Sequence, residues 1–158
     1  MNRKDREVSD VSDVISILKR CNTIRLGLIN HGKPYVVPVS FGLDIVDDKV
    51  VVYFHGAITG LKVDCIAQNE HICIEADIFY KVETTETGIT ARYESVIGTG
   101  IVSKVDGEEK LYGLKKLLEH YGYHDYPIDH CKGLGHTAVY KIVLSKLTGK
   151  RNLPSGNL

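Results

Sequence analysis

The ten residues YFHGAITGLK, at positions 53–62, combine groups that suit the binding of an anion. Three valines precede them, so a buried strand is expected to run into a glycine-bounded turn. A helical pattern then covers residues 61–68, and the free N–H groups at its start would attract negative charge, as would Lys62. The ligand that fits this pattern is a phosphate attached to a planar group, with His55 near the planar part. The alternative is an ordinary strand-to-helix connection with a surface lysine.

The histidines offer a second kind of chemistry. His55 lies at the expected end of a buried strand. It is either a structural histidine with a satisfied hydrogen bond or a residue that positions or protonates a substrate near neutral pH. His31 lies in an expected turn and is predicted to be solvated. The segment from residue 120 to residue 136 suits a lid, a dimer-contact loop or an ordinary surface loop. It is rich in imidazole and phenol side chains: His120, Tyr121, Tyr123, His124, Tyr126, His130 and His136.

Composition narrows the classes of protein. The chain has 158 residues, of which 43% are hydrophobic and 25% are charged, as expected for one globular domain over residues 1–158. Its formal net charge is zero, so no electrostatic attraction to nucleic acid or to a membrane surface is expected. No apolar run reaches the roughly 18 residues that span a bilayer, and the polar N-terminus is unlike a secretory signal. These features predict a cytoplasmic protein, and a near-zero charge permits self-association.

The four cysteines form no CxxC pair. Cys65 and Cys73 lie in apolar patterns and are predicted to be small core residues. The scattered histidines show no paired ligand spacing, so no metal site is expected. Structural disulfides are not expected in a reducing compartment.

The hydrophobic pattern predicts strands and helices along most of the chain. Strands are expected at residues 23–29, 34–41, 50–55, 71–80, 89–104 and 137–145. Helices are expected at residues 11–20, 61–68 and 107–121. The first helix would be capped by Ser9, Asp10 or Ser12. Turns are expected at residues 30–32, 46–48 and 84–88, a loop at 122–135, and a poorly ordered tail at 151–158.

Short connections between most strands imply an antiparallel sheet. About six strands in a chain of this size tend to close into a barrel. Pro38 cannot donate to a ladder, which places it at an edge, a bulge or a ligand-facing rim. Gly98 and Gly100 lie inside a strand rather than at a strand-to-helix turn, so they predict a bend or bulge and not a dinucleotide fingerprint.

Further motifs lie on both sides of the anion-binding segment. They are RKDRE at 3–7, YVVPVSFG at 35–42, ICIEAD at 72–77, RYESVIGTG at 92–100 and LTGK at 147–150. In this order, and over nearly the whole chain, these motifs resemble the nitroimidazole-resistance branch of the flavin-binding split-barrel proteins, the superfamily of pyridoxamine-phosphate oxidase. The resemblance implies a mainly β fold, namely a six-stranded antiparallel split barrel with inserted helices.

The resemblance also implies a homodimer with a flavin at the subunit interface. FMN is favoured over FAD because the anion site offers a single phosphate grip. Pro38, Val39 and Ser40 would face the isoalloxazine ring, and Phe54, His55 and Gly56 would line the ring and its near edge. Lys62 would take the phosphate, and Ser95, Val96 and Lys150 would add contacts from neighbouring strands. His55 is the candidate catalytic residue, and a flavin site of this kind needs backbone groups, apolar walls and cations.

The implied activity is flavin-dependent reduction of a small organic molecule, such as the nitro group of a nitroimidazole antibiotic. Three alternatives stay open. They are a flavin-binding protein that senses redox state or stores cofactor, a binder of haem or another tetrapyrrole, and an oxidase like pyridoxamine-phosphate oxidase. That oxidase uses a dense set of arginines and lysines for two phosphates. This chain has only six arginines, which disfavours oxidation of a vitamin B6 compound.

Overall fold

Eight strands pair into one antiparallel sheet, in the order β3-β2-β6-β7-β8-β5-β4, and β1 pairs with β8 beside this path. The structure is a computed structural model that describes residues 3–128 and 131–154. The strands are β1 (Glu7–Val8), β2 (Ile24–Asn30), β3 (Lys33–Val39), β4 (Phe41–Val46), β5 (Lys49–Ala57), β6 (His71–Thr85), β7 (Gly88–Val105) and β8 (Thr137–Asn152). The helices are α1 (Val11–Arg20), α2 (Leu61–Gln68) and α3 (Gly107–His120), with short 3-10 helices at Lys4–Arg6 and Leu134–His136.

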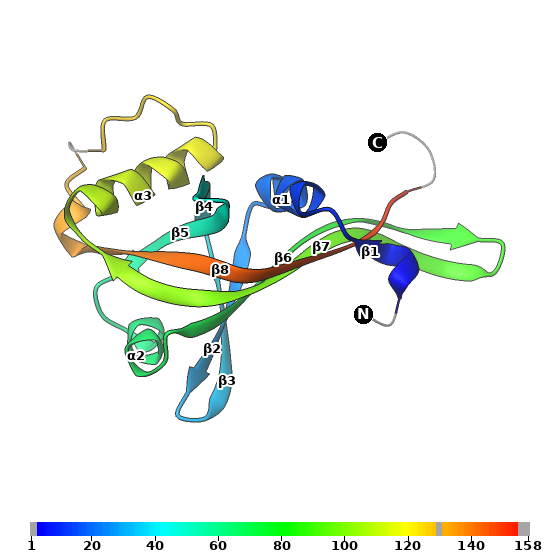
Figure 1. Cartoon of the computed structure of the whole chain (residues 1–158), viewed down its shortest axis with the longest axis horizontal. Coiled ribbons are helices and arrows are strands. Elements are labelled where there is room, and N and C mark those ends of the chain that lie inside the picture. Colours follow the sequence, from blue (N-terminus) through cyan, green and yellow to red (C-terminus); the bar gives the residue numbers. More distant parts are fainter. Residues whose placement is uncertain (1–2, 129–130, 155–158) are drawn as a thin grey trace.

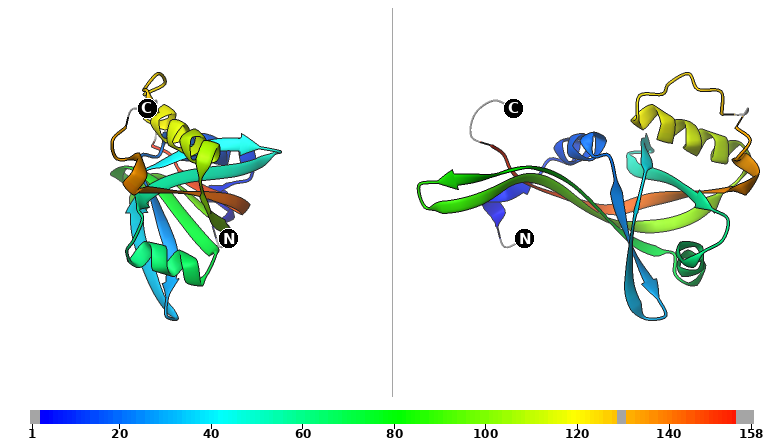
Figure 2. Two further views of the ribbon diagram at one scale, coloured as in Figure 1. Left: turned by 90° about the vertical axis from the view of Figure 1, so that its left-hand side faces the viewer. Right: turned by 180° about the vertical axis from the view of Figure 1, so that it is seen from behind.

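The sheet curves until its two ends meet. Its edge strands β3 and β4 follow each other in the chain and are separated only by Ser40. Figures 1 and 2 show the curved sheet, with the β2–β3 hairpin and the β6–β7 hairpin extending from it in different directions. This arrangement of antiparallel strands with inserted helices confirms the predicted split barrel.

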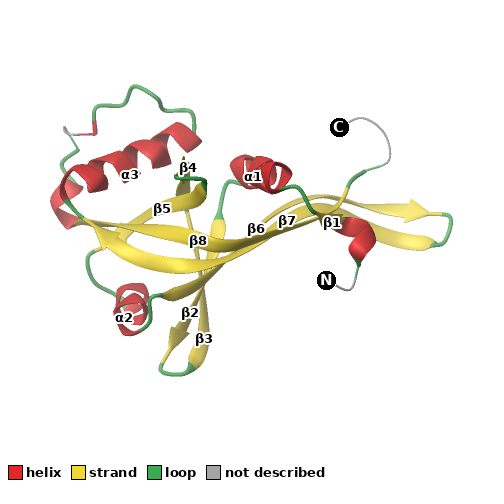
Figure 3. Ribbon diagram, in the orientation of Figure 1, coloured by secondary structure: helices red, strands yellow, loops and turns green. Residues whose placement is uncertain are grey.

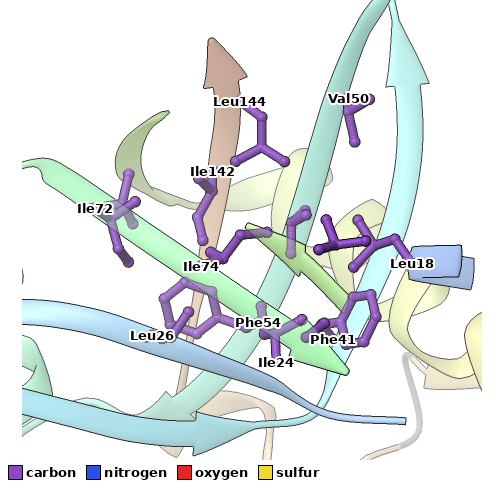
Figure 4. Close-up of a cluster of buried hydrophobic side chains, with 14 of the residues drawn as sticks. Leu18, Ile24, Leu26, Phe41, Val50, Phe54, Ile72, Ile74, Ile142 and Leu144 are labelled. Carbon is purple, nitrogen blue, oxygen red and sulfur yellow. The ribbon is translucent and has the colours of Figure 1, made fainter. Parts of the chain in front are cut away.

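Alternation of side chains along the strands decides which face is buried. In β2, Ile24, Leu26 and Leu28 are at most 2% exposed. The corresponding side chains of β4, β5, β6 and β8 meet them in one core, which Figure 4 shows around Phe41 and Phe54. The opposite face of the sheet, which points away from this core, is the outer face.

Helix α1 begins where the sequence predicts, and one of the three candidate caps holds it. The Asp10 carboxylate accepts a hydrogen bond from the backbone N–H of Ser12 at 2.8 Å. Val14, Ile17 and Leu18 of this helix are buried in the core. Helix α2 has the predicted bounds, and α3 ends one residue earlier than predicted.

Helix α3 packs on the outer face of the sheet, against β4, β5 and β8. Figure 3 shows it lying along one end of the sheet. Two glycines permit the close approach. A Cβ added at Gly42 would lie 2.4 Å from the backbone nitrogen of Leu117, and one added at Gly113 would lie 2.7 Å from the ring of Tyr53. The outer face over β2, β6 and β7 is left uncovered by this helix.

The described residues form eight strands, whereas the sequence predicts six. The stretch 34–41 is not one strand, because the chain turns at Ser40 and continues as β4 to Val46. Strand β1 was missed because two residues are too few to show a period-two pattern. Strand β8 continues to Asn152, paired with β7, so the predicted tail is wrong for Arg151 and Asn152. Residues 155–158 of that tail lie outside the described residues.

Two predictions about irregular strand positions are confirmed. The register of β7 against β8 shifts between Thr99 and Gly100, which is the predicted bulge. A Cβ at Gly100 would lie 2.2 Å from the carbonyl oxygen of Val143, so no side chain fits there. Pro38 lies in β3, an edge strand of the sheet path.

Candidate functional site

The turn between β5 and α2 brings Lys62 back over the end of β5. A Cβ added at Gly56 would lie 2.7 Å from Nζ of Lys62, so the lysine occupies space that the glycine leaves open. The ammonium also lies 5.4 Å from the centroid of the Phe54 ring. That ring is fully buried and stacks on Tyr140 with centroids 5.1 Å apart. Lys62 is thus held against a rigid surface instead of extending into solvent.

The start of α2 adds free backbone donors to the same place. Gly60 precedes the helix with a φ of 124° and provides no side-chain cap. The first bond of the helix runs from the N–H of Asp64 to the carbonyl oxygen of Gly60. The N–H groups of residues 61–63 therefore have no partner within the helix. Together with the positive end of the helix dipole and Lys62, they could hold a phosphate or another anion.

Lys62 is not paired with a carboxylate in the part of the chain that the structure describes. The side chain is half-buried, and burial lowers the pKa of its ammonium group. A half-buried cation without a counter-charge is stabilised when an anion replaces its lost solvation. The structure therefore supports the anion-binding interpretation of this segment over that of a solvated surface lysine.

His55 lies beside this site but on the other face of β5, because successive side chains of a strand alternate. Phe54 faces the core, whereas His55 is paired across the sheet with Val139 on the face that α3 covers. Burial, and next to it the positive charge of Lys62, lower the pKa of the His55 imidazole. The lowered pKa favours the neutral ring, which can donate one hydrogen bond and accept another.

His55 lines an apolar cavity of about 610 Å³, which lies between α3 and the segment that follows this helix. Leu114, Leu117 and Leu118 of α3 form one wall, and Tyr126 and Leu134 are among the residues of the facing wall. The volume is in the range of sites that hold a small organic ligand. Part of the histidine- and tyrosine-rich loop thus lines a cavity beside the candidate catalytic residue. His130, which the sequence analysis includes in this loop, lies outside the described residues.

Three of the predicted cofactor residues lie on the outer face of the sheet. Ser95 and Lys150 are directly paired across β7 and β8. Pro38 is paired with Arg25. The guanidinium of Arg25 is neutralised by Glu75 at 2.8 Å, so it is not a free cation for a ligand.

Three others belong to the core. Phe54 is 0% exposed and Val96 is 1% exposed, and Val39 packs against the same cluster. The backbone of Phe54 and of Val96 is also paired with a strand on each side, so these two residues offer a ligand little access. Ser40 is exposed between β3 and β4. The predicted cofactor residues are thus divided between the core, the outer face and the end of β5, where Gly56, His55 and Lys62 lie.

Cys65 is buried as predicted, but the prediction that Cys73 is a core residue is wrong. Cys73 is half-buried on the outer face, paired with Gly27 of β2 and Thr99 of β7. The signal was present in the sequence, because Ile72 and Ile74 on either side alternate with it and are buried.

The described residues include no group of three or more His, Cys, Asp or Glu side chains that could hold a metal ion. Within the same residues, no helix is both long and apolar enough to span a bilayer.

The sequence matches the family model described as pyridoxamine 5'-phosphate oxidase over residues 10–151. The chain therefore belongs to the pyridoxamine 5'-phosphate oxidase family, and a flavin, FMN or FAD, fits this family as cofactor. No match is found among the curated proteins.

Solved structures share the fold over most of their length. A candidate 5-nitroimidazole antibiotic resistance protein from Bacteroides thetaiotaomicron is 26% identical, with a TM-score of 0.78 over 91% of this chain and 85% of that one. The flavocytochrome Anf3 from Azotobacter vinelandii is 19% identical, with a TM-score of 0.77 over 99% and 75% of the two chains. An FAD and heme binding protein from Mycobacterium smegmatis is 16% identical, with a TM-score of 0.77 over 96% and 77%. The last two show likeness of fold alone.

Proposed function

We propose that this protein is a flavin-dependent reductase of small organic molecules. The phosphate of FMN, or the diphosphate of FAD, binds at Lys62 and the start of α2. The observation that carries the proposal is the state of Lys62. It is half-buried and makes no ion pair among the described residues, it lies over Gly56, and the first N–H groups of its helix have no partner within the helix. This arrangement is unfavourable for a cation until an anion arrives.

The ring of the flavin lies on the outer face of the sheet, between two copies of the chain. The interior of a barrel of this size is filled by its own side chains, so it leaves no room for the ring. The outer face is open and carries large apolar side chains: Ile29 is 41% exposed, Val36 60%, Ile97 51% and Ile101 37%. Such a face is typical of an interface, and a two-fold dimer would give two equivalent flavin sites.

His55 is the residue that acts on the substrate in this proposal. When bound, the flavin supplies the electron and hydride chemistry. The neutral imidazole of His55 orients the substrate by donating a hydrogen bond to it. The imidazolium, formed when the ring takes a proton from solvent, delivers that proton to the substrate as reduction proceeds and returns to the neutral form. The leucine-lined cavity beside His55 suits an uncharged heteroaromatic molecule. A nitroimidazole has this chemistry, and the likeness to a candidate 5-nitroimidazole resistance protein supports it as the substrate class.

A haem protein is the second candidate. The observation that favours it is the imidazole of His55 at the wall of an apolar cavity of about 610 Å³. Apolar walls and a histidine ligand are the usual surroundings of a haem. Two of the similar structures are a flavocytochrome and an FAD and heme binding protein.

The absorbance spectrum and mass of the ligand that co-purifies with the protein test the proposal. Flavin absorption bands with the mass of FMN or FAD support it, whereas a Soret band favours the haem protein. Turnover of a nitroimidazole with a nicotinamide donor then separates a reductase from a protein that only stores flavin. A colourless protein that binds neither FMN nor FAD on addition would contradict the proposal.

A further inference from the structure

The β6–β7 hairpin continues beyond the rest of the sheet as an arm, defined here as residues 79–92. Pairing of β7 with β8 ends at Tyr93 and Asn152, so the arm beyond this point consists of two strands only. Figures 1 and 2 show it projecting past α1 and the N-terminal segment. An isolated two-stranded hairpin is at best marginally stable in water, so an arm of this length needs a surface to pack on.

One face of the arm is apolar and open. Phe79 is 60% exposed, Val82 is 61% exposed and Ile89 is 76% exposed. Strict alternation from Phe79 would place Val82 on the opposite face. The register shift between Phe79 and Lys81 inserts Tyr80 without a partner and brings Val82 to the same face as Phe79. Ile89 reaches this face as well, because it alternates with residues 91 and 93, and residue 93 pairs with Phe79.

The other face of the arm is polar and already has partners. The Arg92 guanidinium lies 2.5 Å from the Glu83 carboxylate and donates a second hydrogen bond to Asn152 at 3.0 Å. The amide of Asn152 in turn donates to the Thr90 hydroxyl at 3.1 Å. The arm is therefore amphipathic, with its polar network on one side and three exposed apolar side chains on the other.

The bulge that creates this apolar face is fixed by the body of the protein. The Tyr80 hydroxyl donates to the carboxylate of Glu94 at 2.5 Å and accepts from the Arg20 guanidinium at 3.0 Å. Glu94 is 2% exposed and pairs with Arg20 at 2.6 Å. The buried carboxylate of Glu94 and the guanidinium of Arg20 thus hold Tyr80 inward, which keeps Val82 and Phe79 on one face.

We propose that the apolar face of the arm packs against a second copy of this chain. The face is continuous with the outer face of the sheet, because alternation along β7 carries it from Ile89 through Tyr93 and Ser95 to Ile97. It therefore extends the surface on which the flavin-bound dimer of the proposed function is built, and the inference rests on that dimer. In a two-fold dimer each subunit contributes the same surface to the interface, so the arms of both subunits are covered.

A double variant that places two lysines on the apolar face of the arm tests the proposal. In Val82→Lys/Ile89→Lys, the dimer dissociation constant measured by sedimentation should rise by about 100-fold or more, the scale for two aliphatic side chains kept in water. The matched control is Val11→Lys, whose parent side chain is 57% exposed but lies on α1, away from the outer face. It should leave the constant unchanged. Retained far-UV circular dichroism confirms that each variant is folded.

Ile97→Lys separates failure of the arm from failure of the dimer. If this variant dissociates and the arm variant remains a dimer, the inference about the arm is wrong while the flavin-binding dimer stands. A parent protein that is monomeric at micromolar concentration overturns both. If the parent is monomeric and binds neutral phosphatidylcholine vesicles through the arm, the apolar face contacts a membrane and the inference is overturned. Slow amide hydrogen exchange in residues 79–92 of the dimer, lost in the monomer, supports it.

Discussion

The ammonium of Lys62 lies 5.4 Å from the centroid of the Phe54 ring, at the end of β5 where Gly56 leaves room for it. A cation over an aromatic face gains some attraction, which partly replaces its lost hydration. Burial still lowers the pKa of the Lys62 ammonium, so the charge is not fully compensated. The relationship couples a core residue of the barrel to the anion site. The contact with Phe54 explains how the long, flexible side chain of Lys62 is kept at one position above the sheet.

Replacement of His55 by alanine separates its possible roles. If His55 orients or protonates the substrate, flavin affinity should stay within a few-fold of the parent. Reduction of a nitroimidazole should slow by roughly 10²-fold or more, the scale for a lost general acid. Flavin affinity, melting temperature and the rate of single-turnover reoxidation are the measurements. A normal reoxidation rate per bound flavin would remove His55 from the catalytic role, and a selective loss of melting temperature would make it structural.

Stability should depend on pH through His55. The pKa of His55 is lowered in the folded chain by burial and by Lys62, so the folded state favours the neutral ring. The neutral ring therefore does not lower the free energy of unfolding above the unfolded pKa of about 6.5. As pH falls below this value, protonation favours the unfolded chain and the free energy of unfolding decreases. The melting temperature of the parent should therefore drop more between pH 7.5 and pH 5.5 than that of His55→Gln. Saturating FMN, which adds negative charge nearby, should reduce the difference. Parallel profiles of parent and variant would show that His55 does not titrate differently on folding.

Helix α3 should be displaced by a single methyl group at position 42. A Cβ at Gly42 would lie 2.4 Å from backbone atoms of Lys116 and Leu117, which cannot move without the helix. Gly42→Ala should cost about 1–3 kcal/mol of unfolding free energy in a urea titration. Because α3 forms a wall of the cavity beside His55, reduction of substrate should fall more than flavin affinity. Gly133→Ala is the control, since a Cβ there meets no atom within 4 Å. Equal stability of the two variants would contradict the packing described.

Local pattern was enough to predict most of the fold. All three helices follow from apolar spacing and end residues, and Gly100 marked the bulge of β7. Strand β4 escaped prediction because Asp44 interrupts its apolar pattern. Its half-buried carboxylate is satisfied by the Tyr112 hydroxyl at 2.6 Å, a partner far away in the sequence. Strand β1 is too short to show a pattern of its own and depends on pairing with β8.

The candidate site was predictable only in part. Lys62 at the start of a helix follows from the sequence, but its position over Gly56 depends on the geometry of the turn. The family resemblance groups Phe54, His55 and Gly56, whereas alternation along β5 puts His55 on the other face. The cavity beside His55 joins β5 to α3 and to the segment after α3, more than fifty residues later. A contact between residues so far apart in the sequence cannot be predicted from a local pattern.

The most direct test of the flavin site is a comparison of FMN and riboflavin, which differ only by the phosphate. Equilibrium affinities of both ligands are measured by quenching of flavin fluorescence, in the parent, in Lys62→Ala and in Lys19→Ala, an exposed lysine of α1. The parent and the Lys19 variant should bind FMN more tightly than riboflavin. Lys62→Ala should lose about 1.5–3 kcal/mol of FMN binding and little or none of riboflavin binding, the scale of one charge-assisted hydrogen bond. Equal losses for the two ligands, or no loss for FMN, would contradict the assignment of Lys62 to the flavin phosphate.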